Sequence, residues 1–273
     1  GMQWNELGER ETQRFLTDMD ALHWRAPDYY VKATEHTPEM IAMILPLIEA
    51  GMAYEVNGSV YFSAASDAEF GKLSHIPFAE MLPIANERGN FPDDPNKRDP
   101  LDFVLWQASQ PGEPTWDSPW GPGRPGWHIE CSAMAARYLG PSFALHGGGS
   151  DLIFPHHECE IAQAENSTGV EPFVRHWVHV GMVEYQGEKM SKSLGNLVLV
   201  SNELKRYSPD AFRLYLLSHH YRHPWEYIDE EIVGWQQVAE DLAMATRLPS
   251  PDGSSELDAA PYRERFLAAM DED

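Results

Sequence analysis

The 273-residue sequence contains only two cysteines, Cys131 and Cys159. Two cysteines cannot build a framework of disulfides, which favours a reducing compartment and leaves metal-binding and catalytic roles open to both thiols. The sequence also lacks a long apolar run. Its most apolar stretch, residues 41–48, is interrupted by Pro46, whereas a membrane-spanning helix needs about 20 apolar residues. No signal peptide is recognisable. We therefore expect a cytoplasmic protein that does not enter a membrane.

Basic residues are scarce as well. The chain has 20 Lys and Arg residues against 43 Asp and Glu residues, which gives a formal net charge of -23. A surface that binds nucleic acid along its backbone needs many Lys and Arg side chains. The composition therefore excludes a broad phosphate-binding surface, so any contact with nucleic acid must be local or lie on a part outside this sequence. The length and the 42% hydrophobic content suit one large or two modest domains.

The first 63 residues predict helices followed by a hairpin. Apolar residues recur at helical spacing within residues 5–50, and Thr37, Pro38 and Gly51 are the expected N-cap, first residue and stop of the second helix. Asn57-Gly58 lies between two short alternating runs, which is a strong hairpin signal. We assign residues 3–63 to this segment.

Residues 64–126 are rich in Pro, Gly and Asp, and they predict an irregular insertion. After it the pattern becomes regular: a helix over 127–140, a strand that runs into a triple glycine at 147–149, a second helix over 152–169 and a second strand over 174–183. This order predicts half of a doubly wound α/β sheet. We assign residues 127–200 to that half and the helical segments of 201–273 to a small bundle.

Cys131, His156 and Glu160 carry the thiolate, imidazole and carboxylate groups that bind zinc. His156 and Glu160 are four residues apart, so on a helix they share one face, and Cys131 would approach from a neighbouring element. The alternative is that Cys131 is a small buried hydrophobe and the other two form a surface contact. Cys159 points away from Glu160 on a helix, and we expect it to serve packing.

Two further motifs suit anions. "HGGGSD", residues 146–151, lies between a strand and a helix, where backbone amides favour a negative ligand and Asp151 could accept hydrogen bonds from ribose hydroxyls. "GEKMSKSLGN", residues 187–196, contains two lysines that could neutralise an anion whose charge moves during a reaction. The alternatives are a structural turn for the first motif and a solvated surface turn for the second. The candidate residues of the second motif are Lys189, Ser191, Lys192 and Ser193.

Three motifs in one order, "GRPGWHIECSAM", "HGGGSDLIFPHHECEIAQAE" and "GEKMSKSLGN", resemble the second half of the catalytic domain of class I cysteinyl-tRNA synthetases. "KATEHTPEMI" upstream and "LKRYSPDAFRLYLLSHHYR" downstream extend the resemblance over nearly the whole chain. It implies a Rossmann-like fold and activation of L-cysteine by ATP with Mg²⁺, followed by transfer to tRNA(Cys).

The resemblance also implies a role for each candidate residue. Zinc (Zn²⁺) would be held by Cys131, His156 and Glu160, and the lysine loop would stabilise the pyrophosphate. Trp127 and His146 would line the amino-acid pocket. The residues expected to hold the nucleotide are Gly149, Asp151, Met182, Val183 and Met190.

The sequence departs from that family in one respect. The family's first half, with an N-terminal zinc cysteine and a His-x-Gly-His nucleotide signature, has no counterpart in these residues. We therefore expect the chain alone to be inactive or severely weakened, and the resemblance leaves open whether it is by itself an enzyme. The family's anticodon-reading part, beyond residue 273, has no counterpart either, and no oligomeric state is predicted.

Two other functions remain open. This sequence also resembles the cysteine ligase of mycothiol biosynthesis. That enzyme activates cysteine in the same way and passes it to glucosaminyl-inositol. Glu160 and His146 favour the synthetase, because we expect the ligase to lack both side chains. A non-catalytic zinc-binding or nucleotide-binding paralogue is the third possibility.

Overall fold

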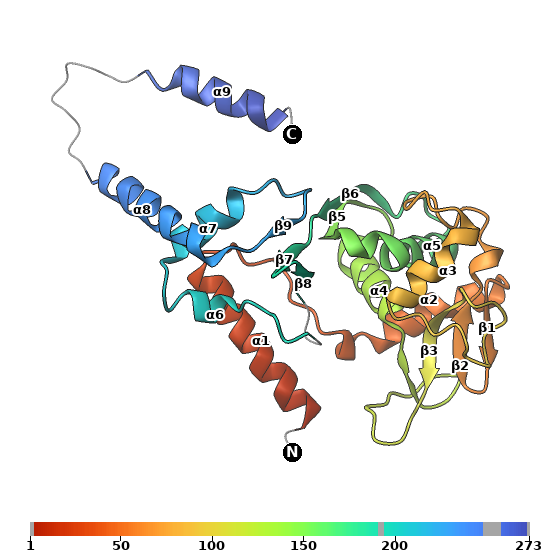
Figure 1. Ribbon diagram of the computed structural model, residues 1–273. Helices are drawn as coiled ribbons and strands as arrows, with labels where there is room; N and C mark the ends of the chain where they lie inside the picture. The colour runs from red at the N-terminus through yellow and green to blue at the C-terminus, as the bar shows by residue number, and fades with distance from the viewer. Residues whose placement is uncertain (1–2, 191–193, 248–257, 272–273) are drawn as a thin grey trace. The chain divides into compact units, whose positions relative to one another are not determined.

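The computed structural model describes residues 3–190, 194–247 and 258–271 (Figure 1). The chain forms two compact units. The larger comprises Trp24–Leu197 and His219–Tyr227, and the smaller comprises the segment up to His23, Val198–Ser218 and the part from Ile228 onward. Among the described residues, no helix is long and apolar enough to span a membrane.

The larger unit contains a four-stranded antiparallel sheet in the order β1-β2-β3-β4. The predicted hairpin is confirmed, since Asn57 and Gly58 connect β1 to β2 and both have positive φ, 52° and 78°. The insertion, however, is not irregular throughout: it contributes a helix and two strands. Its strand β3 has the apolar sequence FVLWQA and pairs with β2. The elements are β1 (Ala53–Val56), β2 (Ser59–Phe62), α3 (Phe78–Glu87), β3 (Phe103–Ala108) and β4 (Gly123–Pro125).

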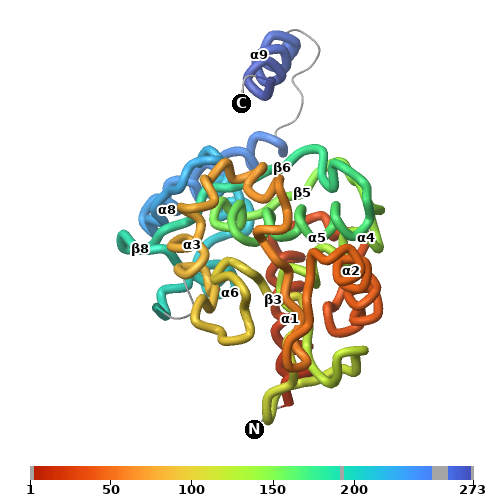
Figure 2. Tube along the Cα trace, turned by 90° about the vertical axis from the view of Figure 1, so that its right-hand side faces the viewer, coloured from red at the N-terminus to blue at the C-terminus, as the bar shows by residue number. Residues whose placement is uncertain are grey.

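Three helices form the core beside this sheet: α2 (Thr37–Glu49), α4 (Trp127–Leu139) and α5 (Glu158–Thr168). Figure 2 shows them grouped together. Helix α2 begins one residue earlier than the sequence predicts. Thr37 is already helical, and His36 precedes the helix without a side-chain cap. Met40, Ile44, Leu47, Leu105 and Ile129 are among the buried side chains of the core.

The predicted βαβ unit is present. Strand β5 (Phe143–Gly149) pairs in parallel with β6 (Val174–Val180), and α5 lies between them in the chain. The triple glycine belongs to β5 itself and not to a turn after it. The predicted helix over 152–169 also begins later, because Phe154 has non-helical backbone angles (φ -137°, ψ 136°) inside the distorted turn Ile153–His157 that precedes α5.

A small three-stranded sheet in the order β8-β7-β9 completes the larger unit. Strand β9 was not foreseen, since two residues leave no periodic signal. The bounds are β7 (Val183–Tyr185), β8 (Glu188–Lys189) and β9 (Trp225–Glu226), and the single-turn helices of this unit are Ala33–Glu35, Ala64–Ser66 and Ser150–Leu152.

The described part of the smaller unit is helical, and it combines α1 with helices from the segment 201–273 that the sequence assigns to a bundle. Ser208 caps α7 by accepting a hydrogen bond from the Ala211 backbone N–H, and α7 packs against α8. Arg206 forms an ion pair with Asp229, the first residue of α8. The helices are α1 (Trp4–Ala21), α6 (Val200–Glu203), α7 (Pro209–Leu217), α8 (Asp229–Ala245) and α9 (Ala260–Asp271).

Candidate metal and nucleotide site

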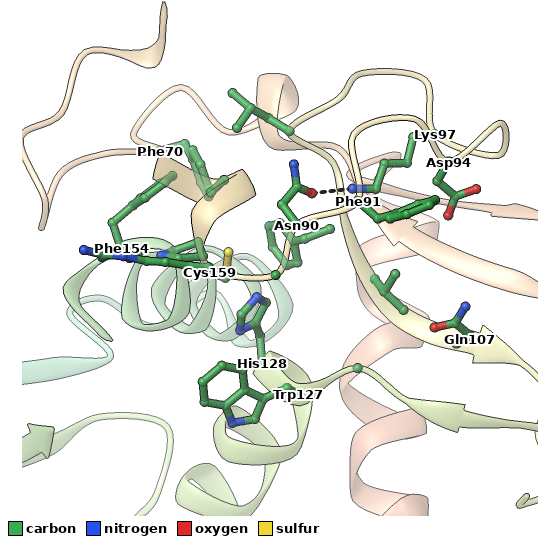
Figure 3. A pocket seen from close by; sticks show the side chains of 18 of the residues that line it. Phe70, Asn90, Phe91, Asp94, Lys97, Gln107, Trp127, His128, Phe154 and Cys159 are labelled. Atoms are coloured by element: carbon green, nitrogen blue, oxygen red, sulfur yellow. Dashed lines mark hydrogen bonds between the residues drawn. The ribbon is translucent and has the colours of Figure 1, made fainter. Parts of the chain in front are cut away.

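A cavity of about 370 Å³ lies between the insertion and the start of α4 (Figure 3). Trp127 and His128, the first two residues of α4, form part of its wall. Both side chains also contact His156: the ring of Trp127 stacks on it with centroids 4.2 Å apart, and the Nδ1 atoms of His128 and His156 are 2.7 Å apart. The cavity and the candidate metal site therefore share a wall.

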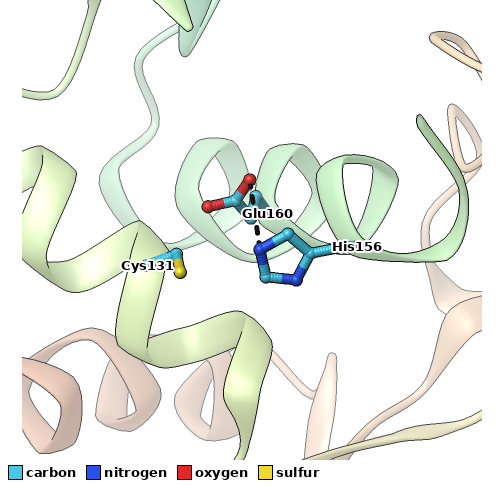
Figure 4. A group of neighbouring side chains, drawn as sticks. All are labelled: Cys131, His156 and Glu160. Carbon is cyan, nitrogen blue, oxygen red and sulfur yellow. Dashed lines mark ion pairs between the residues drawn. The ribbon is translucent and has the colours of Figure 1, made fainter. Parts of the chain in front are cut away.

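The structure brings the three predicted zinc ligands together. Cys131 is on α4, His156 is in the turn before α5, and Glu160 is on α5. One donor atom from each lies within 4.8 Å of the other two, and these atoms face a common space (Figure 4). The His156 Nε2 to Glu160 Oε2 distance is 3.9 Å. His156 and Glu160 thus lie close together, as their spacing predicts, and α4 supplies the third group.

Packing between α4 and α5 fixes this arrangement. The Ser132 hydroxyl lies next to the Glu160 carbonyl at 3.4 Å, and Gln163 Nε2 donates a hydrogen bond of 2.7 Å to the same hydroxyl. Ser132 and Gln163 are fully buried. Because Ser132 directly follows Cys131 in α4, these contacts fix the position of the Cys131 thiol relative to α5.

Glu160 is the strongest indication that a cation belongs here. Its side chain is fully buried, and neither carboxylate oxygen has a hydrogen-bond partner among the described residues. Burial raises the pKa of Glu160 to about 8. A buried carboxylate without donors is costly unless a positive charge compensates it. A divalent metal ion bound by a thiolate, an imidazole and this carboxylate meets that requirement.

Burial favours the uncharged forms of the neighbouring ionisable groups. Burial lowers the pKa of His156 to about 3 and keeps its imidazole neutral, which is the form that binds metals. Burial, assisted by the charges of Glu160 and Glu130, raises the pKa of Cys131 to about 12. Metal binding would therefore release the thiol proton.

A second histidine group shares Glu160. His146 Nε2 and His157 Nε2 lie 3.6 and 3.8 Å from Glu160 Oε2, and donor atoms of these three residues also lie within 4.8 Å of one another. His157 Nδ1 is 2.8 Å from His179 Nε2. Sequence reasoning missed His128, His157 and His179, and only the His-His doublet before Glu158 hinted at them.

The two residues predicted for the amino-acid pocket both border this cluster. Trp127 is 54% exposed and covers His156. His146, which is partly buried, stacks on Trp177 with ring centroids 4.8 Å apart. Trp127 thus contacts the candidate metal site through His156, and His146 approaches it through Glu160.

Three of the five predicted nucleotide residues lie together near the ends of β5 and β6. A Cβ atom on Gly149 would lie 2.5 Å from Asp151 Oδ1 and 3.2 Å from Met182 Sδ, so these three residues surround one point. Val183 begins β7, and Met190 follows β8 and is partly buried. The Arg88 guanidinium donates hydrogen bonds to the carbonyls of Asp151 and Phe154, which anchors this loop to the end of α3.

The lysine loop reaches the same point. Lys189 Nζ forms an ion pair of 2.6 Å with Asp151 Oδ2. The loop begins as a hairpin in which β7 pairs with β8 through positive φ angles at Gln186 and Gly187. The other candidates, Ser191, Lys192 and Ser193, lie outside the described residues.

Comparison with known proteins agrees with this geometry. Residues 1–237 match the family model of tRNA synthetases class I (C) catalytic domain. The chain is 49% identical over 276 residues to a cysteine--tRNA ligase of Dehalococcoides mccartyi, covering 100% of this chain and 59% of the relative. It is 49% identical over 261 residues to an L-cysteine:1D-myo-inositol 2-amino-2-deoxy-alpha-D-glucopyranoside ligase of Kribbella flavida, covering 95% and 64%. The chain thus spans about three fifths of the length of these relatives.

Among solved structures, the chain is similar to a methionyl-tRNA synthetase of Mycobacterium tuberculosis in complex with methionyl-adenylate. The TM-score is 0.64 at 18% identity, over 99% of this chain and 67% of that one. At this identity the match shows the α/β fold that the sequence predicts.

Proposed function

Because this chain belongs to the family of class I (C) tRNA synthetase catalytic domains, we propose that it is the part of an enzyme that activates L-cysteine with ATP and transfers the cysteinyl group to tRNA(Cys). The observation that carries the proposal is the convergence of Cys131, His156 and the unpartnered, buried Glu160 on one space beside Trp127 and His146.

Selection of cysteine is the chemical problem that such a site addresses. Serine differs from cysteine by one atom, and an apolar pocket rejects such an isostere only weakly. Zinc held by Cys131, His156 and Glu160 would supply a thiophilic Lewis acid, which binds the thiolate of cysteine in preference to the hydroxyl of serine. Trp127 and His146 border the same space and would orient the bound amino acid.

Activation needs positioning and charge neutralisation more than covalent help. A carboxylate oxygen of cysteine attacks the α-phosphorus of ATP, and pyrophosphate, with its Mg²⁺, leaves. Gly149, Asp151, Met182, Val183 and Met190 would hold the nucleotide, in line with the convergence of the first three at one point. An acceptor hydroxyl of tRNA then displaces AMP.

Lys189 would neutralise the pyrophosphate together with Lys192, with Ser191 and Ser193 donating hydrogen bonds. In the present conformation its ammonium pairs with Asp151, and its side chain is 52% exposed. Such a half-exposed pair contributes only about 0–1 kcal/mol. Ribose hydroxyls that bind Asp151 would therefore release Lys189 for the phosphates at little cost.

The test is cysteine-dependent exchange of pyrophosphate into ATP by the complete polypeptide that carries this chain, measured together with its zinc content. We expect exchange with cysteine to exceed exchange with serine strongly. Glu160→Gln should lower both bound zinc and cysteine exchange, whereas Glu55→Gln, an exposed carboxylate on β1, should change neither. Exchange without preference for cysteine would refute the proposal.

The second candidate acceptor is the amino sugar of the Kribbella flavida ligase. That ligase is as similar in sequence to this chain as the cysteine--tRNA ligase is, at 49% identity each. Both functions share the adenylation step. Side-by-side transfer assays with tRNA and the amino sugar distinguish them, and cysteine binding without exchange would indicate a non-catalytic paralogue.

A further inference from the structure

We propose that Arg88 is a positioning residue for the ribose of the bound nucleotide: it holds Asp151 in place while Lys189 moves from Asp151 to the phosphates. This inference rests on the proposed function and adds to it a residue of the insertion that none of the motifs contains. It depends on the hydrogen bonds of Arg88, on the support of Asp151 from two sides and on the packing of α3 against the turn before α5.

Arg88 directly follows α3, and its side chain reaches the two short turns that precede α5. One guanidinium nitrogen, Nη1, donates a hydrogen bond of 2.8 Å to the Asp151 carbonyl and another hydrogen bond to the Phe154 carbonyl. This nitrogen carries two hydrogens, so it can serve both carbonyls at once, and the planar guanidinium fixes the directions of both bonds. A single side chain of the insertion thus sets the position of the Asp151 backbone relative to Phe154.

Asp151 is held from two sides. Its carboxylate forms the ion pair with Lys189, and its backbone carbonyl accepts the hydrogen bond from Arg88. The side chains of Lys189 and Asp151 are 52% and 29% exposed, so water screens the ion pair and a bound nucleotide can replace it at little cost. The bond from Arg88 leaves the carboxylate free for ribose hydroxyls. Arg88 therefore supports Asp151 both before and after Lys189 has moved.

Phe154 has a second anchor that Asp151 lacks. Its side chain is buried against apolar residues of α3, which fixes the turn that leads to the candidate metal ligand His156. Asp151 lies in the single-turn helix Ser150–Leu152, whose three residues are only half-buried. Loss of the Arg88 side chain should therefore release Asp151 and leave Phe154 and His156 in place.

This difference has a kinetic signature. A ribose contact is made equally in bound ATP and in the transition state, and loss of such uniform binding raises KM without lowering kcat. Lysine at position 88 would keep the positive charge, but its shorter stem and single ammonium cannot reproduce the two directed bonds of the guanidinium. Arg88→Lys therefore separates a positioning role from a role of charge alone.

The experiment uses the complete polypeptide, Arg88→Met and Arg88→Lys. Isothermal titration calorimetry measures the binding of ATP and of 2′,3′-dideoxy-ATP, which lacks both ribose hydroxyls, and pyrophosphate exchange gives KM and kcat. The matched control is Arg137→Met, which removes another exposed arginine of the larger unit, 3.7 Å from Glu39. Thermal midpoints and zinc content verify folding. Because each variant is its own reference for the two nucleotides, a general loss of stability does not imitate the expected result.

We expect ATP to bind Arg88→Met and Arg88→Lys about tenfold more weakly than it binds the parent, the scale of one hydrogen bond to a charged group. KM for ATP should rise by the same factor, whereas kcat, KM for cysteine and bound zinc should stay within about twofold of the parent. The parent should bind ATP more tightly than the dideoxy nucleotide, and this preference should largely disappear in both variants. Arg137→Met should behave as the parent does.

Four outcomes would overturn the proposal: unchanged ATP affinity in Arg88→Met, parental affinity in Arg88→Lys, equal losses for the two nucleotides, or no preference for ATP in the parent. If the parent shows no cysteine-dependent exchange, the proposed function fails, and the nucleotide titrations still decide whether Arg88 acts through the ribose.

Discussion

His128 Nδ1 lies 2.7 Å from His156 Nδ1, while His156 Nε2 points toward Glu160. In a hydrogen bond between two imidazoles one nitrogen donates and the other accepts. If His156 Nε2 is to bind a metal ion through its lone pair, its Nδ1 must carry the proton and His128 must accept it. Burial lowers the pKa of His128 to about 4, so it is neutral and able to accept. His128 is therefore a positioning residue for the candidate metal ligand.

The first prediction concerns that contact. His128→Ala should weaken zinc binding by about 10-fold to 100-fold, the usual effect of removing a partner of a metal-binding imidazole, because the ring of His156 loses its preferred tautomer. Competition with a chromophoric chelator measures the affinity. His179→Ala is the control, since it removes the partner of His157 and leaves that of His156. Equal losses in both variants would contradict the assignment.

The second prediction separates the two cysteines. Cys131→Ala should abolish stoichiometric zinc binding, because Cys131 faces His156 and Glu160. Cys159→Ala should retain the metal and cost about 1 kcal/mol of unfolding free energy, because Cys159 is buried in the apolar core. Metal analysis and urea denaturation of both variants provide the measurements. Zinc loss in Cys159→Ala alone would reverse the assignment.

The sequence could predict the parts of the site that depend on local spacing. His156 and Glu160 lie one turn apart, and the helix that carries Cys131 ends at Gly140, whose φ is 91°. The resemblance assigns Asp151 to the ribose and Lys189 to the pyrophosphate of one nucleotide, and in the structure the two side chains form an ion pair.

Other features depend on contacts between distant segments, which no local pattern reveals. Strand β3 looks isolated among Pro, Gly and Asp residues, and it becomes a strand because it pairs with β2 and buries Trp106. The hydrogen bond between His128 and His156 joins residues 28 positions apart. The cavity of the insertion, likewise, exists only once α3, β3 and α4 have packed together.

A third prediction concerns pH and the ion pair that ties the insertion to α5. Lys72 Nζ lies 2.5 Å from Glu165 Oε2, and Glu165 also accepts a hydrogen bond from the Phe173 backbone N–H. Burial by itself lowers the pKa of Lys72, but hydrogen bonds and charges from Glu165 and Glu69 outweigh it and raise the pKa above the ordinary value. A lysine whose pKa is raised on folding stabilises the fold fully below its unfolded pKa of about 10.4 and loses that contribution as pH rises further.

Lys72→Met should therefore lower the thermal midpoint by a constant amount between about pH 7 and 9, and the difference from the parent should shrink above about pH 10.4. Differential scanning calorimetry across this range tests the sign. Lys32→Met removes an exposed ammonium 3.7 Å from Glu35 and should change the midpoint little. A difference that widens at high pH would exclude the mechanism.

The last prediction concerns Gly126, which connects the insertion to the helix that carries Cys131. Its backbone N–H donates to the Leu105 carbonyl at 2.9 Å, and a Cβ atom would collide with the carbonyl of Val104 on β3. Backbone atoms cannot move aside as a flexible side chain can, so Gly126→Ala should lower the free energy of unfolding by about 1–3 kcal/mol. It should also displace Trp127 from His156 and change the tryptophan emission. Gly147→Ala is the matched control, because its Cβ would meet nothing closer than the Val178 carbonyl at 3.8 Å. If urea denaturation gave both variants the same stability, the close approach of Gly126 to β3 would not be what sets the start of α4.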